Sequence, residues 1–255
     1  TSIEYKGYTI NILDTPGHAD FGGEVERIMN MVDGVILVVD AYEGTMPQTR
    51  FVLKKALAAG VTPVVVVNKI DKPTARPKEV VDEVLDLFIE LGADIEQLEF
   101  PVIYASAING TSSTEIGLEN QKPTMEPILD AVINTVPDPR VSLEGGFQFQ
   151  PALIDYNDYV GRIGIGLVKR GTAKVGEMVS CIRLDGSKKQ FRIAKLFGFK
   201  GLKKVEIDEA SAGEIVAISG LPDIEVGETV CTVGLEEALP KLRIDEPTMQ
   251  ITIGV

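Results

Sequence analysis

The sequence predicts two folds in succession, a parallel α/β sheet followed by an antiparallel β-barrel. In residues 1–140, short apolar runs alternate with longer segments that have the periodicity of amphipathic helices, as in a sheet covered by helices. In residues 141–240, glycine and β-branched residues alternate in short runs between turn signals, which is typical of a closed antiparallel barrel. The Val136–Arg140 stretch separates the two regions, because its prolines cannot continue a helix.

The first region contains four strand patterns and four helix patterns. Strands are expected at Tyr8–Leu13, Val35–Asp40, Pro63–Asn68 and Pro101–Ala105. Helices are expected at Phe21–Met31, Met46–Ala59, Arg76–Leu91 and Met125–Val136. The continuous apolar runs of the second and third strands predict strands that are buried on both faces. After the barrel, residues 241–255 begin another strand-like segment, which we expect to open a third domain.

Composition narrows the class of protein. No apolar run approaches the ~20 residues that a membrane span needs. The two cysteines, Cys181 and Cys231, are far apart and lack metal-site spacing. We expect reduced thiols in a cytoplasmic protein, with a disulfide between the two cysteines as the alternative. The net charge of −13 argues by itself against a nucleic-acid partner, although residues 1–140 carry most of the acidic excess.

The first chemical motif is Asp14-Thr-Pro-Gly17-His18-Ala-Asp-Phe21, directly after the first predicted strand. Ligands of α/β sheets bind at the carboxyl ends of strands, where Asp14 can hold Mg²⁺ through water. The backbone N–H of Gly17 can approach a phosphate oxygen, because glycine has no side chain. A capped turn, with Asp14 accepting from nearby amides, is the structural alternative. The whole eight-residue string favours the phosphate site.

His18 is the single histidine of the chain. A lone histidine is more often a packing or surface residue than a catalytic one. Here it follows the proposed phosphate-sensing glycine, so its imidazole can reach a water in line with a γ-phosphate. We therefore predict that His18 is catalytic.

The second motif, Asn68-Lys69-Ile-Asp71, follows the third predicted strand. The carboxylate of Asp71 can accept both N–H donors on one edge of guanine, a pairing that adenine does not offer. Asn68 can tie the loop, and the aliphatic part of Lys69 can cover the base. Ser106-Ala107, after the fourth strand, adds a backbone N–H for the guanine carbonyl. Each element is weak alone, and their order and spacing predict a guanine site.

These motifs resemble the G3, G4 and G5 motifs of the translational GTPases. The stretch from Asp14 to Arg27 most resembles the BipA/TypA subfamily, which are ribosome-associated relatives of elongation factor G. Met46–Arg50, Asp155–Gly164 and Ile244–Pro247 fit the same subfamily. The resemblance implies a G domain in residues 1–140, a translation-factor barrel in 141–240 and the start of domain III in 241–255. It also implies GTP/GDP and Mg²⁺ as ligands, the ribosome and ribosomal RNA as partners, and a monomer away from the ribosome.

The chain departs from this family in one respect. The family's G domain begins with a P-loop, Gly-x-x-x-x-Gly-Lys-Ser/Thr, and no such string occurs here. We expect a truncated or incompletely observed form of a longer protein that lacks the first strand, the P-loop and switch I. We also expect the chain as given to be inactive, and the missing strand to lie between those ending at Asp14 and Asp40.

A basic cluster interrupts the acidic chain. Arg183–Lys204 contains eight positive residues and one negative residue. Basic side chains on exposed loops suit phosphate backbones, so Lys188, Lys189 and Arg192 are candidate contacts to RNA. A solvated barrel face is the alternative.

Three functions agree with these observations. The leading one is GTP hydrolysis to GDP and phosphate coupled to ribosome binding. The second is a ribosome- or RNA-binding module without catalysis in the truncated form. The third is the GTPase subunit of a small-molecule adenylyltransferase, which shares the fold.

Overall fold

The computed structural model describes residues 1–15 and 22–242, and these form two compact units. The α/β unit contains Thr15, residues 22–25 and Val32–Asp138. The barrel unit contains Thr1–Asp14, Glu26–Met31 and residues 139–242. The division passes through helix α1 (Gly22–Met29). The segment predicted to open a third domain lies outside the described residues from position 243 onward.

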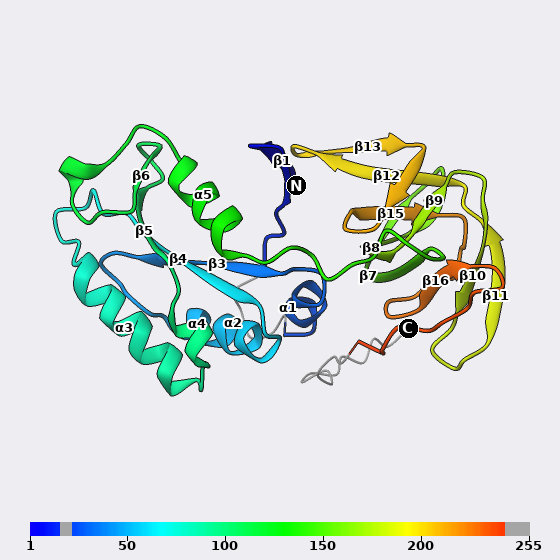
Figure 1. Ribbon diagram of the computed structural model, residues 1–255, viewed down its shortest axis with the longest axis horizontal. Coiled ribbons are helices and arrows are strands. Elements are labelled where there is room, and N and C mark those ends of the chain that lie inside the picture. The colour runs from blue at the N-terminus through cyan, green and yellow to red at the C-terminus, as the bar shows by residue number, and fades with distance from the viewer. Residues whose placement is uncertain (16–21, 243–255) are drawn as a thin grey trace, which may run out of the picture. The chain divides into compact units, whose positions relative to one another are not determined.

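The α/β unit is built on a four-stranded sheet in the order β3-β4-β5-β6 (Figure 1). β3, β4 and β5 are parallel, and β6 is antiparallel to β5. The strands are β3 (Gly34–Asp40), β4 (Thr62–Asn68), β5 (Val102–Ser106) and β6 (Thr111–Ser113). The parallel pairing of the strands predicted at Val35–Asp40, Pro63–Asn68 and Pro101–Ala105 is therefore confirmed, whereas the antiparallel β6 was not predicted.

Helices cover both faces of this sheet. Two apolar clusters carry the packing, one beneath α2 and α3 and the other beneath α5. The helices are α2 (Pro47–Ala58), α3 (Pro77–Glu90), α4 (Ile95–Leu98) and α5 (Glu126–Thr135), with a short 3₁₀ turn at Leu118–Asn120. A proline in the first turn of α2, α3 and α5 marks each start, where its missing N–H is tolerated.

The strands β4 and β3 differ in burial. Residues 63–67 of β4 are all buried, as its apolar run predicted. The expectation that β3 is buried on both faces is wrong, because Ile36 and Val38 are 39% and 58% exposed. β3 lies at the edge of the sheet, and no other described strand pairs with its outer side. Burial on both faces therefore belongs to the central strand.

The first fifteen residues form a β-hairpin. β1 (Ser2–Tyr5) pairs antiparallel with β2 (Tyr8–Asn11) around Lys6 and Gly7, which have positive φ angles of 49° and 83°. Two such residues match the twist of a tight hairpin. The expected single buried strand at Tyr8–Leu13 is therefore corrected, since β2 is half exposed and β1 is its partner. Ser2 and Gly201 exchange backbone hydrogen bonds, which joins this hairpin to the barrel strands.

The barrel unit is an antiparallel sheet of eight strands in the order β11-β10-β16-β7-β8-β15-β12-β13, with β9 and β14 as a separate pair. In the described residues this order ends at β11 and β13, so no continuous ladder closes the barrel. The strands are β7 (Gln148–Asn157), β8 (Gly161–Arg170), β9 (Thr172–Lys174), β10 (Met178–Ile182), β11 (Lys188–Arg192), β12 (Lys195–Lys200), β13 (Lys203–Ile207), β14 (Glu209–Ser211), β15 (Ile215–Ser219) and β16 (Thr229–Thr232).

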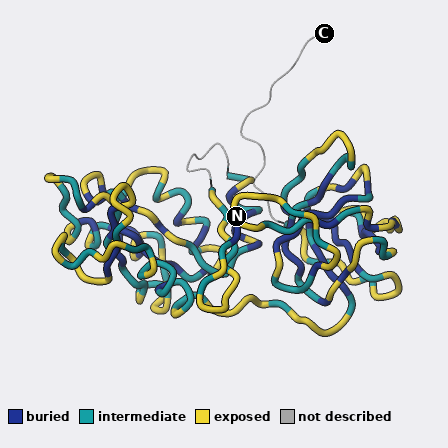
Figure 2. The backbone as a smooth tube through the Cα atoms, turned by 90° about the horizontal axis from the view of Figure 1, so that it is seen from above, coloured by how far each residue is buried: buried dark blue, intermediate teal, exposed yellow. Residues whose placement is uncertain are grey.

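The barrel strands enclose one apolar core (Figure 2). Phe147 and Phe149 are fully buried members of this core, and their rings stack with centroids 6.4 Å apart. Cys181 and Cys231 are buried and free, as expected. Of the helices in the described ranges, none is long and apolar enough to cross a membrane.

Candidate functional site

The candidate site lies where two neighbouring parallel strands end. β4 ends at Asn68 and β5 ends at Ser106, and the register places Asn68 beside Ala105. The buried apolar residues of both strands hold this register. The two predicted base-reading segments therefore begin side by side in the α/β unit.

The amide side chain of Asn68 joins the two segments. Its Oδ1 accepts from the backbone N–H of Lys69 at 2.8 Å and from the N–H of Ala107 at 3.0 Å. Asn68 thus ties the loops together, in the way its position suggested. In the structure the Ala107 N–H donates to Asn68, so its donation to a guanine carbonyl stays a prediction.

A second hydrogen-bond chain fixes the carboxylate of Asp71. The hydroxyl of Ser106, which is 1% exposed, donates to Asp71 Oδ1 at 2.6 Å. Asn109 Nδ2 donates in turn to the Ser106 hydroxyl at 2.9 Å. In the described part of the chain Asp71 Oδ2 has no hydrogen-bond partner, so it remains available to a ligand.

Lys69 has an unusual backbone and a fixed side chain. Its φ angle is +66°, one of two positive values among the described non-glycine residues. Its ammonium lies 2.8 Å from Asp40 Oδ2, and Lys72 approaches the same oxygen at 3.1 Å. The hydrogen bond and the charge of Asp40 raise the pKa of Lys69. Lys69 is therefore anchored at the edge of the site rather than free in solvent.

Asp40 ends strand β3, and its side chain is only 10% exposed. Burial by itself raises the pKa of this carboxyl. The hydrogen bonds from Lys69, the Tyr42 amide, Lys72 and the Glu43 amide outweigh burial and hold the pKa far below the usual range. Asp40 is thus ionised at neutral pH.

A cavity of about 240 Å³ lies beside Asp40, Asn68 and Lys69, and its lining does not include Asp71. Charged, polar and apolar side chains line it together: Val38, Val39, Asp40, Glu43, Gly44, Met46, Thr49, Asn68 and Lys69. Five of the nine lining residues are charged or polar, so the cavity offers a ligand several polar contacts.

The predicted phosphate motif is only partly described. Asp14 is exposed and belongs to the barrel unit, so it is not part of the geometry given above. Gly17 and His18 lie outside the described residues. In the described ranges no three His, Cys, Asp or Glu side chains gather into a metal-binding cluster. A single carboxylate such as Asp14 fits Mg²⁺ that takes its other ligands from phosphate and water.

The basic cluster lies on the barrel, and most of its cations have partners. Lys189 is 3.0 Å from Asp223, Lys188 is 3.7 Å from Glu236, and Arg192 donates to the carbonyl of Gly176. Lys195 and Lys204 form ion pairs with Glu206 and Asp155. Among the described residues, Lys200 and Lys203 have no such partner. The three candidate RNA contacts are exposed on β11 but engaged within the barrel.

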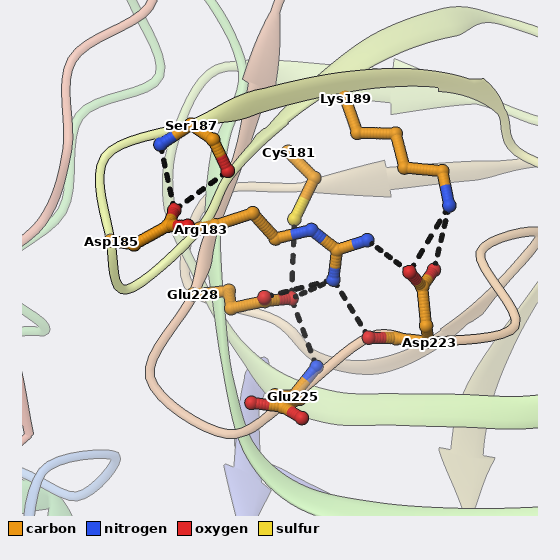
Figure 3. A network of polar contacts seen from close by, with 8 residues as sticks. All are labelled: Cys181, Arg183, Asp185, Ser187, Lys189, Asp223, Glu225 and Glu228. Carbon is orange, nitrogen blue, oxygen red and sulfur yellow. Dashed lines mark hydrogen bonds and ion pairs between the residues drawn. The ribbon is translucent and has the colours of Figure 1, made fainter.

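Arg183, the remaining cation of the cluster, is largely buried (Figure 3). Its Nη1 donates to Glu228 at 2.9 and 3.1 Å and to the carbonyl of Asp223 at 2.7 Å. Glu228 is 2% exposed and also accepts from the Glu225 amide and the Cys181 thiol. Burial, followed by the nearby Glu228 charge, raises the pKa of Cys181 to about 12. Arg183 is therefore a structural residue, which leaves it no part in RNA contact.

Sequence reasoning missed Asp40 and Glu228. For Asp40 a signal was present, since it ends a parallel strand, as Asn68 does. Glu228 gave no signal, because nothing in its neighbourhood in the sequence distinguishes it from a surface acid.

The family models and the curated relatives agree on the family. The family model "Elongation factor Tu GTP binding domain" matches residues 1–138, and "Elongation factor Tu domain 2" matches residues 161–231. A relative from Bacillus subtilis named "Large ribosomal subunit assembly factor BipA" is 66% identical over the whole chain. BipA of Haemophilus influenzae is 52% identical over 98% of the chain, and that of Synechocystis 49% over 100%.

The matches to solved structures support the same fold. Elongation factor SelB from Methanococcus maripaludis in complex with the GTP analogue GppNHp aligns with 91% of the chain and 48% of its own, with a TM-score of 0.70 and 21% identity. The apo form of SelB gives a TM-score of 0.67. The chain spans about two fifths of the length of the BipA relatives. It belongs to the family of the elongation factor Tu GTP-binding domain, the translational GTPases, and its resemblance to the BipA/TypA subfamily is confirmed.

Proposed function

We propose that this chain carries the guanine-reading site and the barrel of a GTPase that hydrolyses GTP to GDP and phosphate. One observation carries the proposal. The loops after β4 and β5 are joined through Asn68, and Ser106 fixes the Asp71 carboxylate with one oxygen left for a ligand. A fixed carboxylate matches the paired N–H donors of guanine, and a buried polar match of this kind gives strong discrimination.

The hydrolytic step is assigned to the motif that begins at Asp14. We propose that Asp14 holds Mg²⁺ through water and that the Gly17 N–H contacts the γ-phosphate. His18 would then orient the attacking water, and Mg²⁺ bound at Asp14 would supply positive charge toward the phosphate oxygens. Most contacts to the phosphates of GTP come from a P-loop in this class of protein. Since the printed sequence has no P-loop string, we propose that these 255 residues alone bind GTP weakly and do not hydrolyse it.

The partner proposed for the whole protein is the ribosome. The BipA relatives are named large ribosomal subunit assembly factors, and they match the chain from end to end. This favours a ribosomal factor over an adenylyltransferase subunit. We assign RNA contact to Lys188, Lys189 and Arg192, each of which must exchange an internal partner for a phosphate. The protein would act in the cytoplasm, as a monomer when it is away from the ribosome.

Partner binding by the barrel unit does not require catalysis. The barrel unit has its own core and edge strands, so it can bind a partner without any nucleotide chemistry. For the 255-residue chain, a ribosome- or RNA-binding module without catalysis is therefore the second candidate.

The Asp71→Asn variant of the full-length protein tests the base assignment. Xanthine has a carbonyl where guanine has an amino group, and an amide at position 71 can donate to that carbonyl. We expect the variant to lose affinity for GTP and to gain affinity for xanthosine triphosphate, measured by calorimetric titration. Asp86→Asn, on the exposed face of α3, is the matched control. Unchanged GTP binding by Asp71→Asn would show that another group reads the base.

A further inference from the structure

The buried carboxylate of Asp40 lies in the candidate site, although Asp40 belongs to none of the base-reading motifs. It ends the strand next to β4, and its register partner is Asn68. Its Oδ1 accepts from the backbone amides of Tyr42 at 2.8 Å and Glu43 at 3.3 Å. Its Oδ2 faces the ammonium groups of Lys69 and Lys72 at 2.8 and 3.1 Å. One oxygen thus holds the loop after β3, and the other holds two cations.

Neighbours in the site hold both the backbone and the ammonium group of Lys69. Its backbone N–H donates to Asn68 Oδ1, and its ammonium is paired with Asp40. Between these points the backbone adopts a φ of +66°, a conformation that is strained for a residue with a Cβ and persists only where the surroundings hold it. The stem of Lys69 is consequently held along the wall of the cavity that Asp40, Asn68 and Lys69 line together.

We propose that Asp40 is a positioning residue of the nucleotide site, which holds the Lys69 side chain in place to cover the plane of the base. This inference rests on the proposed function. Asp40 does not itself contact the ligand. It acts through Lys69, because a side chain that is already ordered loses less conformational entropy when a ligand binds.

Lys72 provides an internal comparison. It pairs with the same oxygen of Asp40 as Lys69 does, but it does not line the cavity. If Asp40 only stabilised the loop, replacing Lys69 and replacing Lys72 would affect nucleotide affinity equally. If Asp40 positions Lys69, then Lys69 alone links Asp40 to the nucleotide.

The experiment is a double-mutant cycle in the full-length protein, with GDP affinity measured by calorimetry. The variants are Asp40→Asn, Lys69→Met and the two combined, with Lys72→Met as the matched control. Asparagine keeps one acceptor oxygen for the amides of Tyr42 and Glu43 and removes the charge that faces the lysines. Circular dichroism verifies that each variant is folded. Inosine diphosphate, which lacks the amino group of guanine, is titrated in parallel.

We expect Asp40→Asn and Lys69→Met each to weaken GDP binding about two- to tenfold, the cost of ordering one long side chain. The double variant should bind no more weakly than the weaker single variant, since both changes remove one interaction. Lys72→Met should bind GDP like the parent. The preference for GDP over inosine diphosphate should stay unchanged in Asp40→Asn, because Asp71 reads the amino group.

Three results would overturn the positioning role: unchanged GDP affinity in Asp40→Asn, multiplied losses in the double variant, or equal losses in Lys69→Met and Lys72→Met. The two lysine variants decide the question on their own if Asp40→Asn does not fold. A failure of the proposed function looks different, since the parent protein would then show no preference for GDP over inosine diphosphate.

Discussion

Removal of Glu228 should destabilise the barrel far more than removal of its neighbour Asp223. Both carboxylates bind Arg183, but Glu228 has 3% of its side chain exposed and Asp223 has 57%. Breaking a buried ion pair from one side costs about 3–5 kcal/mol, because a charge stays buried without a partner. Arg183 keeps its bonds to Asp223 in the Glu228→Ala variant, so we expect the lower end, about 3 kcal/mol. The ion pairs of the exposed Asp223 are screened by solvent and should contribute far less to stability.

Hydrogen exchange measures this difference within the barrel itself. Two units need not unfold in one step, so a single unfolding curve would be hard to interpret, and the chain has no tryptophan to report on either unit. Exchange of the amides of β10 and β16 follows the local free energy of opening. About 3 kcal/mol corresponds to exchange roughly a hundredfold faster in Glu228→Ala.

Two further variants make the reasoning refutable. Asp223→Ala is the exposed control, and the Arg183→Met/Glu228→Leu double variant replaces the whole pair with apolar groups. The double variant should recover most of the lost protection, since a buried pair and a packed apolar pair are often of similar stability. If Glu228→Ala and Asp223→Ala accelerate exchange equally, burial does not determine the strength of this network.

Three other predictions concern catalysis, partner binding and pH. In the full-length protein, His18→Ala should lower kcat roughly 10²–10⁴-fold and leave GTP affinity intact, since a water-orienting group acts in the transition state; an equal loss of affinity would contradict the assignment. Replacing Lys188, Lys189 and Arg192 with alanine should weaken ribosome association. The slope of log K against log salt should fall by at most about 0.7–0.9 for each side chain removed. An unchanged slope would indicate that these residues form a solvated face. Hydrogen bonds from Arg183 and, to a lesser extent, from Lys189 lower the pKa of Asp223 to about 2. The contribution of ionised Asp223 to the stability of the barrel is therefore complete above about pH 4 and is lost as the pH falls toward 2. The barrel of the Asp223→Asn variant should therefore lose less stability than the parent between about pH 4 and pH 2. Acid titration followed by circular dichroism measures this difference, and parallel curves for parent and variant would exclude the contribution of Asp223.

Apolar periodicity predicted the α/β unit well, because its elements are long and their buried faces repeat regularly. The sequence also located the two loops to which we assign base reading, since Asn68 and Ser106 end apolar strands. The β1–β2 hairpin was missed because Lys6-Gly7 is a weak turn signal and its strands have only four residues each. Such short exposed strands carry little apolar pattern.

Pairing between distant side chains could not be predicted. Asp40 binds Lys69 across 29 positions, and Lys189 binds Asp223 across 34. Charge composition gives the number of cations and their rough location, but not which of them meets an acid. The sequence alone therefore suggested a cluster of unpaired cations, although most of them form ion pairs in the structure.

That neutralisation affects how a polyanion would meet the barrel. A cation paired with a carboxylate at about 3 Å acts as a dipole, whose field fades within the ~8 Å screening length of physiological salt. Only unpaired positive charge steers a negatively charged partner over longer distances and accelerates encounter. In the described part of the cluster such charge remains at Lys200 and Lys203, on either side of the exposed Leu202, and at Arg192, whose partner is a backbone carbonyl. Association through this face should consequently be slow and selective, with rates near 10⁵–10⁶ M⁻¹s⁻¹ rather than the diffusion limit, and the specificity would reside in the dissociation step.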